Sequence, residues 1–176
     1  MFALAKLIQW NWQDKFGEKQ FVLVLGGLHI EMAALKTLGN WLEGSGWTTA
    51  LVQADIMSSG KADAMLHASH VTRCRHAHQV TAACLYILQQ RAYKRYLDSV
   101  NIGVAVDFTT WCSDQSNKQP QFHYWALTLQ FELNVLLFVK SVRESNFNLY
   151  MSALSQIIPK FFLPLITITM LVGSSS

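Results

Sequence analysis

Hydrophobic and polar positions along most of this chain follow helical patterns. Residues 2–12 carry apolar side chains at near-helical spacing, and residues 28–42 and 48–57 predict two further helices. Residues 62–97 contain neither glycine nor proline and predict one long helix or two helices that meet near Ser69 and His70. Residues 122–143 predict a helix with apolar neighbours on nearly all sides, and residues 147–158 a last helix that ends at Pro159.

One segment departs from this helical pattern. Phe21–Leu25 is a continuous apolar run bounded by glycines, which is typical of a fully buried strand. Residues 101–108 are a weaker strand candidate, and residues 111–121 predict a polar loop. A lone strand leaves its N–H and C=O groups unpaired, and two strands are still marginal. We therefore expect a predominantly helical α/β fold whose central strand, Phe21–Leu25, has sheet partners outside this chain.

Composition narrows the class of protein. The 176 residues suit one domain or a piece of one, and 51% of them are hydrophobic, which is enough for a core. Only 14% are charged, against about 25% in typical globular proteins. The net charge of +3 is mildly basic, and three dispersed cysteines imply no disulfide framework. We expect an intracellular protein, in nucleus or cytoplasm, without a cofactor.

A basic stretch is the main candidate for binding. Residues 64–97 contain no acidic residue, and tyrosines are interleaved with the positive charges. Such a helix face can contact nucleic-acid phosphates, although a simple solvated face has the same composition. The charges form two separate patches along the predicted helix. The predicted nucleic-acid-binding residues are Arg73, Arg75, Arg91, Lys94 and Arg95.

Metal-binding patterns are weak. His70, Cys74 and His78 are spaced i, i+4, i+8 and would share one helix face, but they span about 12 Å, too far for one tetrahedral ion. His29 and Glu31 form the first half of a zinc deaminase signature whose second half is absent. We expect no metal site, and keep a small metal-dependent hydrolase or nuclease as an alternative.

Glu132 lies within the apolar helix predicted at residues 122–143. Burying an unpaired carboxylate costs much free energy. We therefore expect Glu132 to be paired with a lysine or arginine for structural reasons.

Several stretches resemble a family of animal proteins, common in fish and cnidarians and linked to mobile elements. The resemblance covers residues 2 to about 162 and implies no established activity. It is carried by residues 2–6, 26–36, 44–48, 68–73, 77–81 and 138–144. A strand followed by a glycine turn and a helix is also similar to RNase H-like transposases. The acidic motifs of longer family members would lie outside this chain, so the resemblance implies a fragment of an RNase H-like domain without catalysis of its own.

The end of the chain departs from the family pattern. After Phe162 the family has a sequence close to A-L-D-H-x-N-Y-A-R-W, whereas here no charged residue follows Lys160. A one-base change of reading frame can interconvert the two sequences. We therefore expect a partial domain over residues 1–162 and a frameshifted apolar tail over 163–176. A tail-anchored membrane protein is the remaining alternative, but residues 161–172 are shorter than the about 20 residues that span a bilayer. The expected partners are nucleic acid, another protein or the remainder of the family domain.

Overall fold

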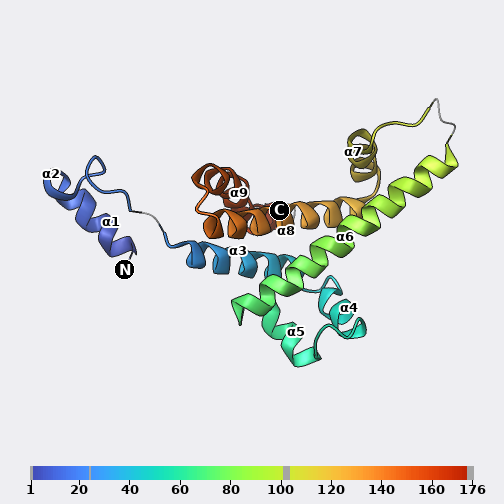
Figure 1. Cartoon of the computed structure of the whole chain (residues 1–176), viewed down its shortest axis with the longest axis horizontal. Helices are drawn as coiled ribbons and strands as arrows, with labels where there is room; N and C mark the ends of the chain where they lie inside the picture. The colour runs from blue at the N-terminus through green and yellow to red at the C-terminus, as the bar shows by residue number, and fades with distance from the viewer. Residues whose placement is uncertain (1, 24, 101–103, 174–176) are drawn as a thin grey trace.

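The computed structural model describes residues 2–23, 25–100 and 104–173, with the side chains of those up to residue 160. In this part of the chain every regular element is an α-helix, and no strand is present. The predicted α/β class, and with it the fragment of an RNase H-like domain, is therefore wrong. The helices are α1 (Phe2–Asn11), α2 (Gln13–Phe16), α3 (Gly27–Leu42), α4 (Trp47–Gln53), α5 (Ser59–Leu66), α6 (Val71–Ser99), α7 (Phe108–Lys118), α8 (Pro120–Arg143) and α9 (Phe147–Gly173) (Figure 1).

The predicted central strand is instead an exposed connection between α2 and α3. Phe21, Val22 and Leu25 are 52%, 82% and 39% exposed, while Val24 lies outside the described residues. A strand persists only where neighbouring strands pair with its backbone groups, and no such neighbour exists in the described ranges. The second strand candidate is also absent at residues 104–108, where α7 begins at Phe108; residues 101–103 lie outside the description.

Helix α8 is the centre of the molecule and packs against α3, α6, α7 and α9. The apolar residues of α3 recur so that one face of the helix is buried against it. Leu133 and Leu137 of α8 remain exposed, so the expectation of a nearly surrounded helix is wrong. The most deeply buried apolar side chains include Leu35, Leu38, Leu42, Val135, Phe138 and Ile157.

Backbone breaks divide the long basic stretch. Helix α5 ends at Leu66 and α6 begins at Val71, so the alternative of two helices meeting near Ser69 and His70 is confirmed. Ala68 and His70 have φ angles of 55° and 60° in the link, a left-handed conformation that a continuous right-handed helix excludes.

Helix α7 occupies most of the predicted polar loop. Asp107 begins it, since its carboxylate accepts hydrogen bonds from the backbone N–H groups of Thr109 and Thr110. These bonds, led by one from the Thr110 hydroxyl, lower the pKa of Asp107. The buried ring of Trp111 packs against Tyr93 of α6 and so attaches α7 to α6.

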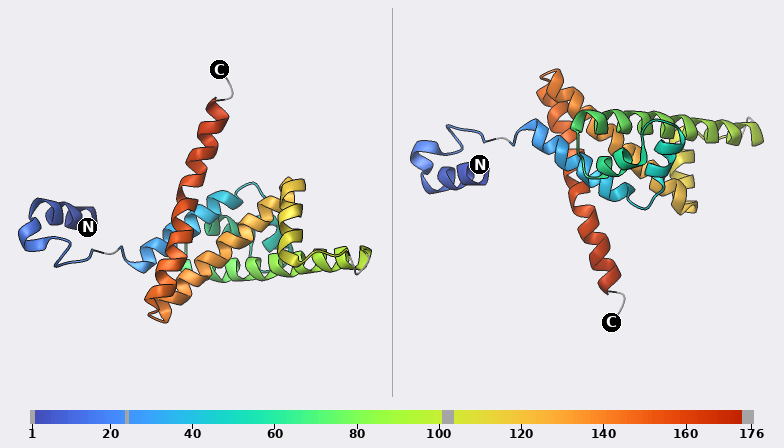
Figure 2. Two further views of the ribbon diagram at one scale, coloured as in Figure 1. Left: turned by 90° about the horizontal axis from the view of Figure 1, so that it is seen from above. Right: turned by 90° about the horizontal axis from the view of Figure 1, so that it is seen from below.

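Both ends of the chain differ from the rest. Helix α9 continues through Pro159, so the predicted end at this proline is wrong. At the other end, α1 and α2 lie apart from the remaining helices in all three ribbon views (Figures 1 and 2). Among the described residues, only α8 is long and apolar enough to cross a membrane, and 44% of its apolar window is buried within the protein.

Gly39 permits the closest approach between α3 and α5. A Cβ atom at this position would overlap the carbonyl group of Leu66 at the end of α5. Glycine normally weakens a helix interior, so its presence here is explained by the backbone contact. Gly60, in the first turn of α5, has open space where a Cβ atom would lie.

We predict that Gly39→Ala lowers the free energy of unfolding by about 1–3 kcal/mol, because α3 and α5 must separate to admit the methyl group. Gly60→Ala is the matched control and should leave stability unchanged or raise it by up to about 1 kcal/mol, as alanine does in an uncrowded helix. Urea unfolding followed by circular dichroism measures both. Equal effects of the two substitutions would contradict the tight α3–α5 contact.

Candidate functional site

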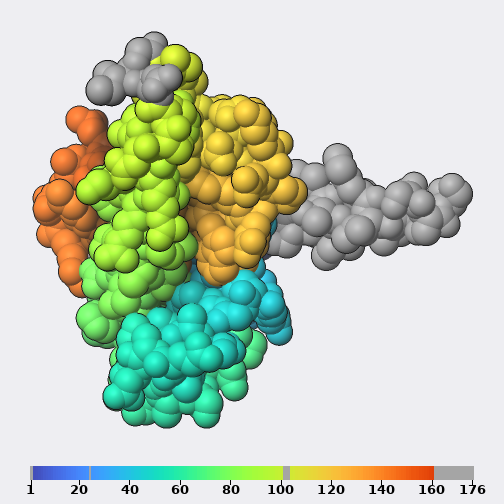
Figure 3. Space-filling model, turned by 90° about the vertical axis from the view of Figure 1, so that its right-hand side faces the viewer, coloured from blue at the N-terminus to red at the C-terminus, as the bar shows by residue number. Residues whose placement is uncertain are grey.

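All five predicted nucleic-acid-binding residues lie on α6, which runs along one face of the molecule with α7 at its side and the α4–α5 pair at its lower end in the view (Figure 3). Arg91, Lys94 and Arg95 are exposed near its C-terminal end, and we call them the basic end of α6. Arg73 is also exposed, but 18 residues of helix place it about 27 Å from Arg91. None of these four makes an ion pair with a residue that the structure describes.

Arg75 is used within the fold. Its guanidinium donates two hydrogen bonds to Glu31 of α3, from Nε to Oε1 at 2.8 Å and from Nη2 to Oε2 at 2.9 Å. Both side chains are mostly buried, so this bidentate pair connects α3 to α6. Arg75 therefore cannot contact a phosphate, nor Glu31 a metal ion, unless the pair separates. His29, the other half of the H-x-E pattern, is exposed on the first turn of α3.

The three weak metal candidates have different environments. His70 precedes α6, Cys74 is buried, and His78 is buried one helical turn further on. The Cys74 thiol contacts the Ser69 carbonyl oxygen at 2.9 Å and the Met65 sulfur at 3.3 Å. Burial raises the pKa of Cys74, which opposes the thiolate that a metal requires. No three His, Cys, Asp or Glu side chains within the described ranges are grouped so that they could hold a metal ion.

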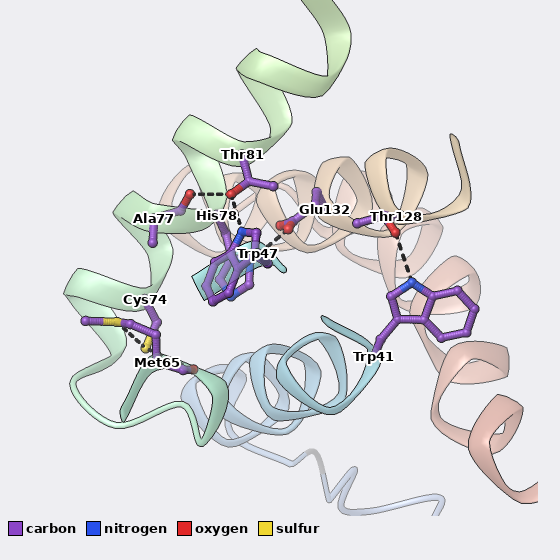
Figure 4. Close-up of polar contacts among 9 residues, drawn as sticks. All are labelled: Trp41, Trp47, Met65, Cys74, Ala77, His78, Thr81, Thr128 and Glu132. Atoms are coloured by element: carbon purple, nitrogen blue, oxygen red, sulfur yellow. Dashed lines mark hydrogen bonds and ion pairs between the residues drawn. The ribbon is translucent and has the colours of Figure 1, made fainter. Parts of the chain in front are cut away.

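A buried polar pair joins the middle of α6 to α8. His78 Nδ1 lies 2.8 Å from Glu132 Oε1, and both side chains are completely inaccessible to solvent (Figure 4). The Trp47 ring stacks on the His78 ring with centroids 5.2 Å apart. Trp47 Nε1 also donates a 2.7 Å hydrogen bond to Thr81, whose hydroxyl donates to the Ala77 carbonyl. The expected pairing of Glu132 is correct, but its partner is a histidine and not a lysine or arginine.

The environment of Glu132 favours its protonated form. Burial raises the pKa of this carboxyl, and the charge and hydrogen bond of His78 offset part of the increase. Whichever group carries the proton, the two share one hydrogen bond in an apolar interior. His78 Nε2 and Glu132 Oε2 have no further hydrogen-bond partner among the described residues. Loss of either partner therefore leaves a buried polar group alone.

A cavity lies beside this pair, between α4, α6 and the first half of α8. We call it the α4–α6–α8 pocket; its volume is about 680 Å³. Trp47 and Thr81 belong both to its wall and to the hydrogen-bonded group around His78. None of its lining residues is charged. Its apolar wall includes Leu51, Ile56, Val80, Leu85, Leu88, Phe122, Trp125 and Leu129.

The polar groups of the pocket are concentrated toward one end. Helices α6 and α8 run antiparallel here, since His78 pairs with Glu132 while the later part of α6 meets the start of α8 through α7 (Figure 1). Gln89 on α6 therefore lies toward the same end as Gln119 and Gln121. These three amides make no hydrogen bond with any residue that the structure describes, so they are available to a ligand.

Sequence reasoning missed the pocket. Its wall combines apolar residues of three helices that are distant along the chain, and each helix by itself has only an ordinary apolar face. In the sequence, Glu132 was the one residue that indicated a tertiary contact beside the pocket, since a carboxylate in an apolar helix needs a specific buried partner. Its partner is 54 residues away, so no local spacing could identify it.

Comparison of the chain with protein-family models, curated proteins and solved structures finds no match. The resemblance to mobile-element proteins therefore stays a prediction. The geometry of the described residues is what supports a function.

We predict that Glu132→Leu lowers the free energy of unfolding by about 2–3 kcal/mol, because it leaves the buried His78 ring without its hydrogen-bond partner. Glu132→Gln should cost less, about 1 kcal/mol, since the amide keeps a hydrogen bond to the imidazole. Urea unfolding of the wild type and of both variants measures these differences. The pair would be unimportant if Leu and Gln at this position had equal effects.

The same variants test the raised pKa of Glu132. Above the ordinary glutamate pKa the unfolded chain releases this proton first, so the folded state binds more protons and is destabilised as pH rises. The stability of the wild type relative to Glu132→Gln should therefore fall between about pH 4.5 and the pKa of the folded state. Glu43→Gln, at the exposed end of α3, is the control and should not reproduce this trend.

Proposed function

We propose that this protein binds a neutral, mainly apolar small molecule in the α4–α6–α8 pocket. The observation that carries the proposal is a cavity of about 680 Å³ without a single charged lining residue. Pockets for small molecules usually have about 300–1,000 Å³ and apolar walls with a few polar groups. The cavity has both properties.

The chemistry of the wall supports a neutral ligand. A charged group taken into this pocket would lose its hydration and find no opposite charge, which is costly. The indole rings of Trp47 and Trp125 and the surrounding aliphatic side chains offer apolar contact area instead. The amides of Gln89, Gln119 and Gln121 can donate to and accept from an uncharged polar group. These features favour an apolar body with a hydroxyl or amide at one end.

The arrangement supports binding and not a reaction. His78 and Glu132, the one closely paired acid and base beside the pocket, are fully buried and do not line it. The Thr81 hydroxyl, which does line it, is already engaged by Trp47 and Ala77. The Cys84 thiol also lines the pocket, but no base is hydrogen-bonded to it among the described residues, so a ligand there would touch no nucleophile that is paired with a base.

We predict that the protein binds the neutral fluorescent probe N-phenyl-1-naphthylamine and that decanol displaces it. Decanoate should compete at least about tenfold less well, because its carboxylate would be buried without a cation. Ala50→Trp should abolish probe binding by filling the pocket. Ala83→Trp is the matched control, an exposed helical alanine outside the lining, and should bind normally.

Probe titration and competition by fluorescence measure all five quantities. Equal competition by decanol and decanoate would contradict the neutral ligand class. Unchanged binding by Ala50→Trp would place the probe outside the α4–α6–α8 pocket and so refute the proposed function.

Nucleic-acid binding is the second candidate. It is supported by the basic end of α6, where three exposed cations share one side of a helix without an ion-pair partner in the described residues. Origin from a mobile element, which the sequence resemblance implies, is compatible with such a partner. Arg75, held by Glu31, does not contribute to this surface.

We predict a salt-sensitive gel shift with duplex DNA or RNA at low salt. Reversal of the basic end, Arg91→Glu with Lys94→Glu and Arg95→Glu, should abolish it and reduce the salt slope by up to about three. The control carries the same charge change at other exposed positions, Lys36→Glu with Lys61→Glu and Arg143→Glu. Equal loss in both triple variants would indicate unspecific attraction, and no shift in the wild type would eliminate this candidate.

A further inference from the structure

The α1–α2 unit has the reverse of a normal amphipathic arrangement. Gln9 is its one fully buried side chain and donates a 2.6 Å hydrogen bond to the Phe21 carbonyl oxygen. Lys6 is turned to the same side, where its ammonium group contacts Gln9 at 2.9 Å and Glu18 at 3.1 Å. Polar groups therefore form the inside of this small unit, and its apolar side chains are left outside.

Large apolar side chains are exposed on α1, on α2 and at the residue between them. Leu4, Leu7 and Ile8 are spaced i, i+3 and i+4 and therefore lie on one side of α1. Trp10, three residues after Leu7, is 59% exposed, and Trp12, which follows the end of α1, is 55% exposed. We call the set the apolar N-terminal face; it consists of Leu4, Leu7, Ile8, Trp10, Trp12 and Phe16.

We propose that the apolar N-terminal face lies in the interfacial region of a lipid bilayer. Aliphatic side chains together with exposed indoles are the composition of helices that lie in the plane of a membrane, and tryptophan is enriched where hydrocarbon meets water. The face consists of exposed side chains of α1, α2 and the residue between them, and a lipid surface can receive them without a complementary groove. The inference goes beyond the proposed function and does not depend on the α4–α6–α8 pocket.

Charge and size favour lipid over a second copy of the chain. Since Lys6 is paired with Glu18, Lys15 and Lys19 against Asp14 leave one excess positive charge, which attracts anionic headgroups weakly. A standard protein interface needs about 800 Å² and 20–30 residues on each side. Helix α1 has 10 residues and is about 15 Å long, so two copies of this face would form a smaller contact than that.

The test is co-sedimentation of the full chain with phosphatidylcholine vesicles, with and without phosphatidylserine. We expect binding to both, stronger with phosphatidylserine. Leu7→Gln with Trp10→Gln should weaken binding at least about tenfold, because two apolar side chains that the bilayer would bury are replaced by polar ones. Tyr86→Gln with Leu97→Gln removes two exposed apolar side chains of α6 and is the matched control that should bind normally.

A second measurement does not depend on the stability of α1. Trp10→Phe with Trp12→Phe keeps the face apolar and should still sediment with vesicles, but should lose the tryptophan quenching by brominated lipid that the wild type shows. The proposal is overturned if the wild type does not bind vesicles, if the Leu7 and Trp10 variant binds as tightly as the control, or if light scattering shows a dimer that this variant disrupts. Ala50→Trp, which fills the pocket, should leave vesicle binding unchanged, so failure here and failure of the proposed function are distinguishable.

Discussion

The hydrogen-bonded pair of His78 and Glu132 is the constraint on which the arrangement of the central helices depends. Helix α8 is apolar enough to form the core, yet it carries a carboxylate in its middle. This carboxylate can be buried only where a partner forms a hydrogen bond with it, so α6 must pack on α8 with His78 opposite Glu132. Trp47 then covers the imidazole and joins α4 to the same group. This polar contact thus helps to select the register of α4, α6 and α8, while the Arg75–Glu31 pair and the Trp41–Thr128 hydrogen bond orient α3 against α6 and α8.

The pocket follows from the same register. Trp47 is held against His78 by stacking and by its bond to Thr81, so its ring cannot fill the space between α4 and the later part of α6. At the far end, Trp111 of α7 packs on Tyr93 of α6 and on Phe122 of α8, which fixes the two helices there as well. The helices are held at both ends of the contact, and the region between them remains open.

The sequence predicted helices correctly where the local pattern of apolar and polar residues is sufficient to determine the structure. The apolar positions of α3 and the stretch 62–97, which contains no glycine and covers most of α5 and α6, are such cases. Interpretation failed where the deciding partner is distant: Phe21–Leu25 has the composition of a strand, but only neighbouring strands could have made it one. For α7, the Asp107 cap was a local signal that the polar composition of the segment concealed. The pairing of Glu31 with Arg75 and of Glu132 with His78 required tertiary contacts across 44 and 54 residues.

The apolar surfaces of this protein differ in shape, and shape determines what each can bind. The α4–α6–α8 pocket is concave, so it can remove most of a small molecule from water, and its size and neutral wall then limit the ligand. The apolar N-terminal face consists of outward side chains of two short helices and the residue between them, and no pocket is found there among the described residues. Such a face loses contact with water only by entering an apolar medium or by lying against a larger surface. The polar side chains on the inner side of the unit already have partners: Gln9 is bonded to Phe21, and Lys6 is paired with Glu18. Insertion into lipid would therefore bury no unpaired charge from this inner side. A bilayer interface meets these conditions without requiring any further protein shape.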